Sequence, residues 1–322
     1  MVTLNLTIDR HTCVAHGRVI SVSIESPIAA IFRTVDSFMG KLAVVTGGGS
    51  GMGRELVCQL AAQGCSVAVC DWHEAAVAET AALAQAGTPY SVRVSSHVCD
   101  VSAEAQVLRF RDELLTEHVS DHVDLVFSNA GIGGGGSFIA DSREEWERTF
   151  AVDWWGVYYC ARAFLPLLIA SGNGVLVNTS SLAGFWASLG PGAPNTAYST
   201  AKFAVKGFTE ALIEDLRVNA PSVRVAVVMP GHVGTNLVAN SLRAHGQPAL
   251  ERANADFRDN APLSSSEAAA VILDGVRSGA WRILVGEDAK GVDAAVRANP
   301  DAAYDYAELF GIVTAAPPAG PH

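Results

Sequence analysis

Short apolar runs alternate with longer helical runs along most of the chain, and this alternation constrains the fold more than any other sequence feature. The apolar runs are continuous, as expected for parallel strands that are covered on both faces. We expect strands at 42–45, 67–70, 92–98, 123–127, 174–178, 223–228 and 281–285. We expect helices between them at 54–63, 74–86, 103–117, 143–169, 197–219 and 266–278. The pattern predicts an α/β domain with a doubly wound parallel sheet of about seven strands and helices on both faces.

A glycine-rich segment, 46–53, joins the first expected strand to the first expected helix, and ligands of such sheets bind at this kind of junction. Its glycines follow the spacing Gly47-x-x-x-Gly51-x-Gly53, which departs from the strict G-x-G-x-x-G pattern. Glycines there let the backbone approach a pyrophosphate at the N-terminus of the helix. A flexible turn is the alternative, but the strand–loop–helix context favours a dinucleotide.

An aspartate, Asp71, ends the second expected strand. A carboxylate at that point can accept both hydrogen bonds from the ribose diol of an adenosine and would repel a 2′-phosphate. Ser50 and Trp72 stand where a phosphate-binding basic residue would be expected. The sequence therefore favours NAD over NADP.

Tyr198 and Lys202 are four residues apart at the start of an expected helix, so they share one face. A phenol with its ordinary pKa of about 10 is a poor base at neutral pH, and a nearby ammonium lowers that pKa. The pair can then exchange a proton with an alcohol or a carbonyl. The spacing alone is common by chance, so other motifs must support this interpretation.

Six motifs in order, spread over about 40–286, resemble those of the short-chain dehydrogenase/reductase family, which has a Rossmann-type fold. They are the loop 46–53, Asp100-Val101, Asn129-Ala-Gly131, Ser181, Tyr198-x-x-x-Lys202 and the stretch 230–235. The resemblance implies hydride transfer with a nicotinamide cofactor. The implied cofactor-binding residues are Gly47, Ser50, Gly51, Met52, Gly53, Asp71, Trp72, Asp100, Val101, Asn129, Ala130, Gly131, Tyr198, Lys202, Pro230, Gly231, Val233 and Thr235.

The resemblance also implies the catalytic roles. Ser181 would hydrogen-bond the substrate oxygen, Tyr198 would be the acid/base, and Lys202 would hold the nicotinamide ribose. Ser181 precedes Tyr198 by a few residues more than is usual in the family, which indicates a longer loop between them. Ser180 is a rival for the catalytic hydroxyl. Asp153 occupies the position of a family asparagine that holds a water, and it would either hold that water or pair with Lys202.

The chain is expected to have three parts, namely an N-terminal extension at 1–38, the Rossmann-type domain at 39–290 and a C-terminal tail at 291–322. The extension is a start-site artefact if translation begins at Val35 or Met39. Deletion of 1–34 would then leave thermal stability and cofactor affinity unchanged. Alternatively, the alternating run 19–24 adds a strand or an interface arm.

Composition excludes several classes of protein. The formal net charge of −11 argues against a nucleic-acid partner. No apolar run is long enough to span a membrane as a helix. Six cysteines without a C-x-x-C pair suit a reducing cytoplasm, and nine histidines lack metal-ligand spacing. We expect a cytoplasmic protein with no metal.

The substrate side is expected to be apolar. Leu182, Phe185 and Trp186 should face the substrate, and the family resemblance implies a lid at 236–262. A medium-sized, mostly apolar secondary alcohol or ketone is the expected substrate. The resemblance implies a homodimer or homotetramer through the helices at 143–169 and 197–219. Two alternatives are a catalytically silent NAD-binding sensor and an NADPH-dependent ketoreductase.

Overall fold

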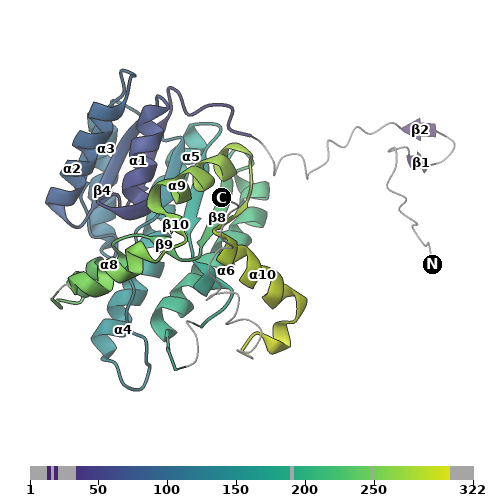
Figure 1. Cartoon of the computed structure of the whole chain (residues 1–322). Helices are drawn as coiled ribbons and strands as arrows, with labels where there is room; N and C mark the ends of the chain where they lie inside the picture. The colour runs from purple at the N-terminus through teal and green to yellow at the C-terminus, as the bar shows by residue number, and fades with distance from the viewer. Residues whose placement is uncertain (1–12, 16–17, 21–33, 189–191, 249, 305–322) are drawn as a thin grey trace, which may run out of the picture.

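A computed structural model describes residues 13–15, 18–20, 34–188, 192–248 and 250–304. These described residues form a seven-stranded, all-parallel sheet, which confirms the predicted fold class (Figure 1). In spatial order its strands are β11 (Arg282–Val285), β8 (Arg224–Pro230), β7 (Val175–Thr179), β6 (Leu125–Ser128), β3 (Leu42–Thr46), β4 (Ser66–Asp71) and β5 (Val94–Val98). The order turns back between β3 and β6, which opens a crevice where ligands of such sheets bind.

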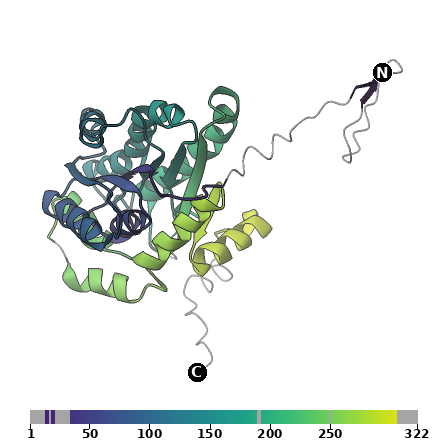
Figure 2. The ribbon, with the colours of Figure 1, turned by 90° about the horizontal axis from the view of Figure 1, so that it is seen from above.

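Helices cover both faces of the sheet, and Figure 2 shows the strands between two helical layers. Three helices pack on one face, namely α1 (Gly51–Ala62), α2 (Glu74–Gly87) and α9 (Ser265–Arg277). Three more pack on the other, namely α3 (Glu104–His118), α5 (Gly156–Ala170) and α6 (Thr196–Asn219). Along β3, Val44 joins one core cluster and Val45 the other, so the strand is apolar throughout.

The helical run expected at 143–169 is interrupted. It consists of α4 (Arg143–Phe150), a π-helical segment (Ala151–Trp155) and then α5. An inserted π turn re-aims the side chains that it carries and is frequent at functional sites. This segment carries Asp153, and the apolar pattern of the sequence does not reveal the interruption.

The expected lid, 236–262, folds as two short helices. They are α7 (Leu237–Ala244) and α8 (Glu251–Asp259), with residue 249 outside the described part of the chain. β9 (Val233–Gly234) precedes them and pairs in parallel with β10 (Leu263–Ser264), which follows them. The two ends of the lid are therefore held together.

The N-terminal boundary differs from the expected one. Val35 and Phe38, which we placed in the extension, are 2% and 1% exposed and belong to the core. The Phe38 ring also packs under the guanidinium of Arg277 in α9. The domain therefore begins before residue 39, because two of its core side chains precede the first strand.

Upstream, β1 (Cys13–Ala15) pairs antiparallel with β2 (Arg18–Ile20). The described part of this region contains no pairing between that hairpin and the main sheet. Most of the run 19–24 lies outside the described residues, so the two explanations of the extension stay predictions.

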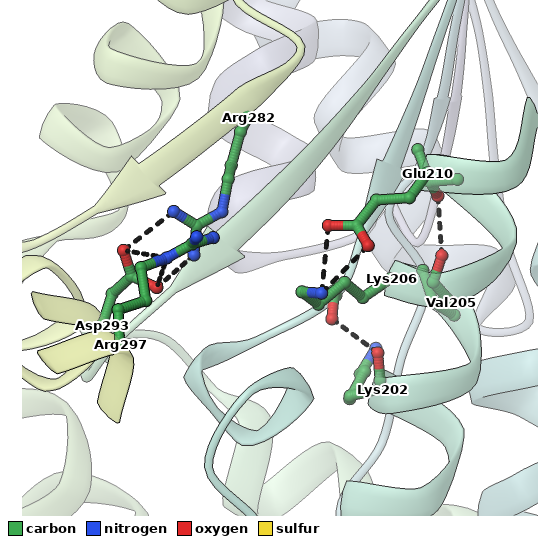
Figure 3. Close-up of polar contacts among 9 residues, drawn as sticks. Lys202, Val205, Lys206, Glu210, Arg282, Asp293 and Arg297 are labelled. Carbon is green, nitrogen blue, oxygen red and sulfur yellow. Dashed lines mark hydrogen bonds and ion pairs between the residues drawn. The ribbon is translucent and has the colours of Figure 1, made fainter. Parts of the chain in front are cut away.

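The segment after residue 290 is not simply a tail. The boundary falls inside α10 (Glu287–Ala298), which is followed by a short 3-10 turn (Pro300–Ala302). Figure 3 shows Asp293 of α10 between Arg282 of β11 and Arg297. Its oxygens lie 2.8 Å from Arg282 Nη1 and 2.9 Å from Arg297 Nε. These ion pairs and the buried Val292 hold α10 on the domain.

Candidate active site

The glycine loop after β3 is shaped by close backbone approaches. Gly47 and Gly51 have φ of +65° and +55°, which side chains disfavour. A β-carbon at Gly53 would lie 2.2 Å from the carbonyl oxygen of Gly47. The Asn129 side chain donates to the carbonyl of Thr46 over 3.1 Å. The end of β6 therefore fixes the loop from behind.

The Asp71 carboxylate faces this loop from the end of β4. Its Oδ2 accepts from the backbone nitrogen of Gly49 (2.9 Å), and its Oδ1 accepts from that of His73 (3.0 Å). A β-carbon at Gly49 would lie only 2.9 Å from the carboxylate. The acid is thus beside the part of the loop where a ribose would lie next to a pyrophosphate.

Asp100 and Arg148 form a second charged contact in the cleft. Asp100 Oδ2 lies 2.9 Å from Arg148 Nη1, and its Oδ1 accepts from the backbone nitrogen (3.0 Å) and hydroxyl (2.7 Å) of Ser102. Burial acts to raise the pKa of Asp100, but the Ser102 hydrogen bonds and the Arg148 charge outweigh it and hold the pKa below its ordinary value. The carboxylate is therefore ionised and fixed in place.

Tyr198 and Lys202 lie on the first turns of α6, with Lys202 Nζ 5.3 Å from the centre of the Tyr198 ring. Burial raises the pKa of Tyr198, the Lys202 ammonium opposes this, and the Asp153 carboxylate adds to it. Ser181, which follows β7, acts on the Tyr198 hydroxyl and lowers its pKa. The net shift is upward, so the lowering that we expected from Lys202 alone does not prevail.

The two candidate serines point in different directions. The Ser180 hydroxyl donates to the backbone carbonyl of Lys202 over 2.7 Å, and a β-carbon at Gly184 would lie 2.2 Å from that hydroxyl oxygen. Ser181 instead meets Tyr198, while its hydroxyl oxygen accepts from the backbone nitrogen of Ala183 (3.1 Å). This geometry favours Ser181 over Ser180 as the hydroxyl available to a substrate.

Asp153 is fully buried behind Lys202. Its Oδ1 lies 3.0 Å from Lys202 Nζ and accepts from the backbone nitrogen of Ile132 (3.3 Å). Lys202 Nζ also donates to the carbonyl of Thr179 (3.2 Å). Burial lowers the pKa of Lys202, but the carboxylate outweighs it and the net shift is upward. Asp153 therefore contacts the lysine directly.

The turn after β8 joins the cleft to two distant helices. A β-carbon at Gly231 would lie 2.2 Å from the carboxylate of Asp288 in α10, which accepts from the backbone nitrogen of His232 (2.6 Å). His232 Nε2 donates to the carbonyl of Phe257 in α8 (2.7 Å). Pro230 and Gly231 are thus held from both the C-terminal helix and the lid.

The lid helix α7 spans the cleft. Asn240 donates to the Ser50 hydroxyl of the glycine loop (2.9 Å), and Ser241 Oγ accepts from the backbone nitrogen of Gly133 (2.7 Å). His245 Nε2 donates to the carbonyl of Gly133 (2.9 Å). The lid therefore bridges the loops that follow β3 and β6.

These groups line one cleft of about 160 Å³, to which every residue that we expected to bind the cofactor contributes. Ser181 lines it as well, whereas Asp153 lies behind it. The residues 41–245 match the sequence profile of the family described as short chain dehydrogenase. The chain belongs to the short-chain dehydrogenase/reductase family. This confirms the resemblance seen in the sequence, and the chain is an NAD(P)-dependent oxidoreductase.

Two relatives that are similar in sequence carry names of oxidoreductases. The oxidoreductase designated SadH of Mycobacterium tuberculosis is 39% identical over 82% of this chain and 92% of its own length. The meso-2,3-butanediol dehydrogenase of Serratia marcescens is 32% identical over 62% of this chain and 74% of its own.

Solved structures of the family also match. A short-chain dehydrogenase/reductase of Burkholderia phymatum in complex with NAD has a TM-score of 0.72 and 28% identity, over 83% of this chain and 95% of its own. A metagenomic family member in complex with NADP has a TM-score of 0.53 and 30% identity, over 60% of this chain and 83% of its own. Family members thus bind either cofactor.

Of the three side chains that we expected to face the substrate, Leu182 and Trp186 are buried and Phe185 is partly buried. Trp186 is 1% exposed, and its Nε1 donates to the carbonyl of Ala303 over 2.6 Å. Leu182 and Phe185 pack in the same cluster against α10. The physical reason is the segment that we assigned to a tail, because it folds back and packs onto these side chains.

Sequence reasoning missed several residues of this family site. The apolar lining consists mainly of Ile132, Val152, Leu237, Ala244 and Phe257, and the charged lining includes Arg148. Ile132 directly follows the Asn129-Ala-Gly131 motif, so its position was a usable signal. The other residues lie on helices whose rotation toward the cleft no local pattern reveals.

The described residues contain neither a metal-binding cluster nor a membrane-spanning helix. Within them, no group of three or more histidine, cysteine or acidic side chains has the geometry of a metal site. No helix in the same residues is long and apolar enough to cross a membrane.

Proposed function

We propose that this oxidoreductase uses NAD to interconvert a secondary alcohol and a ketone on a medium-sized, mostly apolar substrate. The observation that carries the proposal is the contact of Tyr198 with Ser181 beside Lys202, in the same cleft as the glycine loop. In this proposal Tyr198 is the acid/base, Ser181 holds the substrate oxygen and Lys202 holds the nicotinamide ribose.

The residues present fit a dinucleotide. The loop lacks β-carbons where its backbone packs closely, and the side chain of Ser50 does not cap the N-terminus of α1, which leaves that end open to a phosphate. We propose that the Asp71 carboxylate turns from Gly49 to the ribose diol and disfavours a 2′-phosphate. When bound, the nicotinamide supplies or accepts the hydride, and this chain's residues manage the proton.

The lining supports an apolar substrate. Ile132, Val152, Leu237 and Phe257 form apolar walls. Among the described lining residues, the lysine and arginine side chains are Lys202 and Arg148, and each is paired with a carboxylate. An unpaired cation for a substrate carboxylate or phosphate is therefore lacking in this part of the chain. The relative named as a meso-2,3-butanediol dehydrogenase supports the secondary alcohol, because 2,3-butanediol carries two secondary hydroxyl groups.

We propose a homodimer or homotetramer in which α5 and α6 meet their copies. The Trp155 ring beside α5 and the Phe203 ring of α6 are each 41% exposed, which suits a covered surface. Light scattering at micromolar concentration tests this, and a monomer would contradict it. A cytoplasmic location is proposed because the five cysteines whose side chains are described are free thiols.

A turnover assay tests the proposed reaction. Purified protein is mixed with secondary alcohols or ketones and either NAD(H) or NADP(H), and nicotinamide absorbance is followed. We expect turnover with NAD(H), and a loss of about 10²- to 10⁴-fold in Tyr198→Phe with NAD affinity retained. Equal or tighter NADP(H) binding would contradict the cofactor assignment and favour an NADPH-dependent ketoreductase. NAD binding without turnover of any compound would favour a silent sensor.

A further inference from the structure

The buried ion pair of Asp153 and Lys202 has a consequence for the direction of catalysis. Asp153 is 0% exposed and Lys202 is 2% exposed, and their charged atoms are 3.0 Å apart. Within the described residues, Asp153 Oδ2 has no hydrogen-bond partner, and burial raises the pKa of Asp153. The Lys202 ammonium, in direct contact with Oδ1, opposes that rise and is the cation that favours the ionised carboxylate. A neutral asparagine at this position would leave the lysine charge uncompensated.

The charged and titratable groups that act on this pair come from three elements. Lys202 and Tyr198 lie on α6, Asp153 lies on the π-helical segment, and His245 lies at the end of α7. Burial has the largest influence on Tyr198 and raises its pKa; the Lys202 ammonium lowers that pKa, and the Asp153 carboxylate raises it again. Because the carboxylate contacts the ammonium directly, it cancels much of the field that would otherwise stabilise a phenolate.

We propose that Asp153 is a positioning residue that offsets part of the Lys202 charge and holds Tyr198 protonated up to a higher pH than Lys202 alone would, so that carbonyl reduction persists to, and alcohol oxidation begins at, a more alkaline pH. This inference rests on the proposed function of the same cleft.

Carbonyl reduction requires the protonated form of Tyr198. The carbonyl carbon gains a hydride from NADH, the carbonyl oxygen takes the phenolic proton of Tyr198, and an alcohol, NAD⁺ and a tyrosinate result. The tyrosinate then regains a proton from solvent. Alcohol oxidation is the reverse and needs the phenolate at the start, which the Asp153 carboxylate disfavours.

Asp153→Asn is the test variant, because it keeps the size of the side chain and removes its charge. The matched control is Glu210→Gln on α6, the helix that carries Lys202. Figure 3 shows Glu210 paired with Lys206, one turn beyond Lys202, and their charged atoms are 3.0 Å apart. The control removes a carboxylate from a lysine that lies outside the cleft.

The first measurement needs no substrate or cofactor. Tyrosinate absorbance is titrated with pH, and the curve of Tyr198→Phe is subtracted to isolate Tyr198. We expect a wild-type midpoint above the ordinary phenol value of about 10, and a midpoint lower by about one pH unit in Asp153→Asn. Glu210→Gln should match the wild type. A wild-type midpoint below that ordinary value overturns the proposal, even if Asp153→Asn does not fold.

The second measurement is the pH profile of turnover in both directions. We expect the rise of alcohol oxidation with pH to move about one unit toward acid in Asp153→Asn, and the fall of ketone reduction to move with it. Both proteins are compared in the same cofactor state, so the charge of the cofactor cancels. Coincident profiles and coincident tyrosinate midpoints refute the role of Asp153. A shifted midpoint in a protein without turnover would instead refute the proposed reaction alone.

Discussion

The two halves of the cleft are built in different ways. The glycine-loop half consists of the loop 46–53, Asp71 and Asp100, and close backbone packing at its glycines, together with side chain–backbone hydrogen bonds at the strand ends, holds it together. The lid half consists of 181–186, α7, α8 and α10, which are far apart in the sequence and meet through side chains. Backbone geometry tolerates few changes, whereas side-chain contacts between distant elements can be exchanged. We therefore expect the first half to govern cofactor binding and the second to govern substrate choice.

The largest expected effect is a break in the glycine-loop half. Gly53→Ala puts a β-carbon 2.2 Å from the Gly47 carbonyl oxygen, and backbone cannot move aside cheaply. Cofactor affinity should fall by about 1–3 kcal/mol, measured by titration of NAD into the protein. Gly87→Ala is the control, because its β-carbon would meet no atom within 4 Å. Equal affinity in both variants would show that the loop is less constrained than its geometry implies.

A smaller effect is expected from the lid half. Trp186→Phe removes the hydrogen bond to Ala303 and leaves that carbonyl without its partner, at a cost of about 1 kcal/mol. The segment 182–186 should loosen, so the KM for an apolar ketone should rise several-fold. The dissociation constant for NAD should not change, because the contact lies away from the glycine loop. A matching rise in that constant would mean that the two halves are coupled.

The smallest expected effect is a loss of folding stability in acid. At the end of α3, His118 Nε2 lies 2.8 Å from Ser95 Oγ of β5, and burial lowers the pKa of His118 from 6.5 to about 4. Between those values the unfolded chain binds a proton that the folded chain does not. Stability should therefore fall by roughly 1 kcal/mol as the pH drops through this window, after allowance for partial exposure. Urea unfolding should show a flatter pH dependence in His118→Gln.

The ion pairs of Asp293, which hold α10 on the domain, should remain intact in this pH range. Burial acts to raise the pKa of Asp293, but Arg282 and Arg297 outweigh it and hold the pKa below its ordinary 3.8. The stability that this carboxylate contributes is therefore present above pH 3.8 and is lost only as the pH falls further. Asp293→Asn should be less stable than the wild type above pH 3.8. If the two proteins become equally stable well above that pH, this expectation is wrong.

The sequence by itself determined the fold class and the family. Continuous apolar strands, helices between them and six ordered motifs are local features, and local features survive in a linear pattern. The expected cofactor residues line one cleft because parallel strands bring their carboxyl ends to one edge of a sheet. The sequence did not distinguish Ser180 from Ser181, because the preference for Ser181 depends on the hydrogen bond of the Ser180 hydroxyl to the backbone carbonyl of Lys202.

Tertiary structure alone decided the rest. The π-helical segment that aims Asp153 at Lys202 leaves the apolar pattern unchanged, so no periodicity reveals it. Val35 and Phe38 precede the first strand, and the sequence does not show that they fill the core. The fold of α10 over Trp186 joins residues more than a hundred positions apart. Contacts of that range depend on the geometry of the whole domain, because the elements that make them carry no local sign of one another.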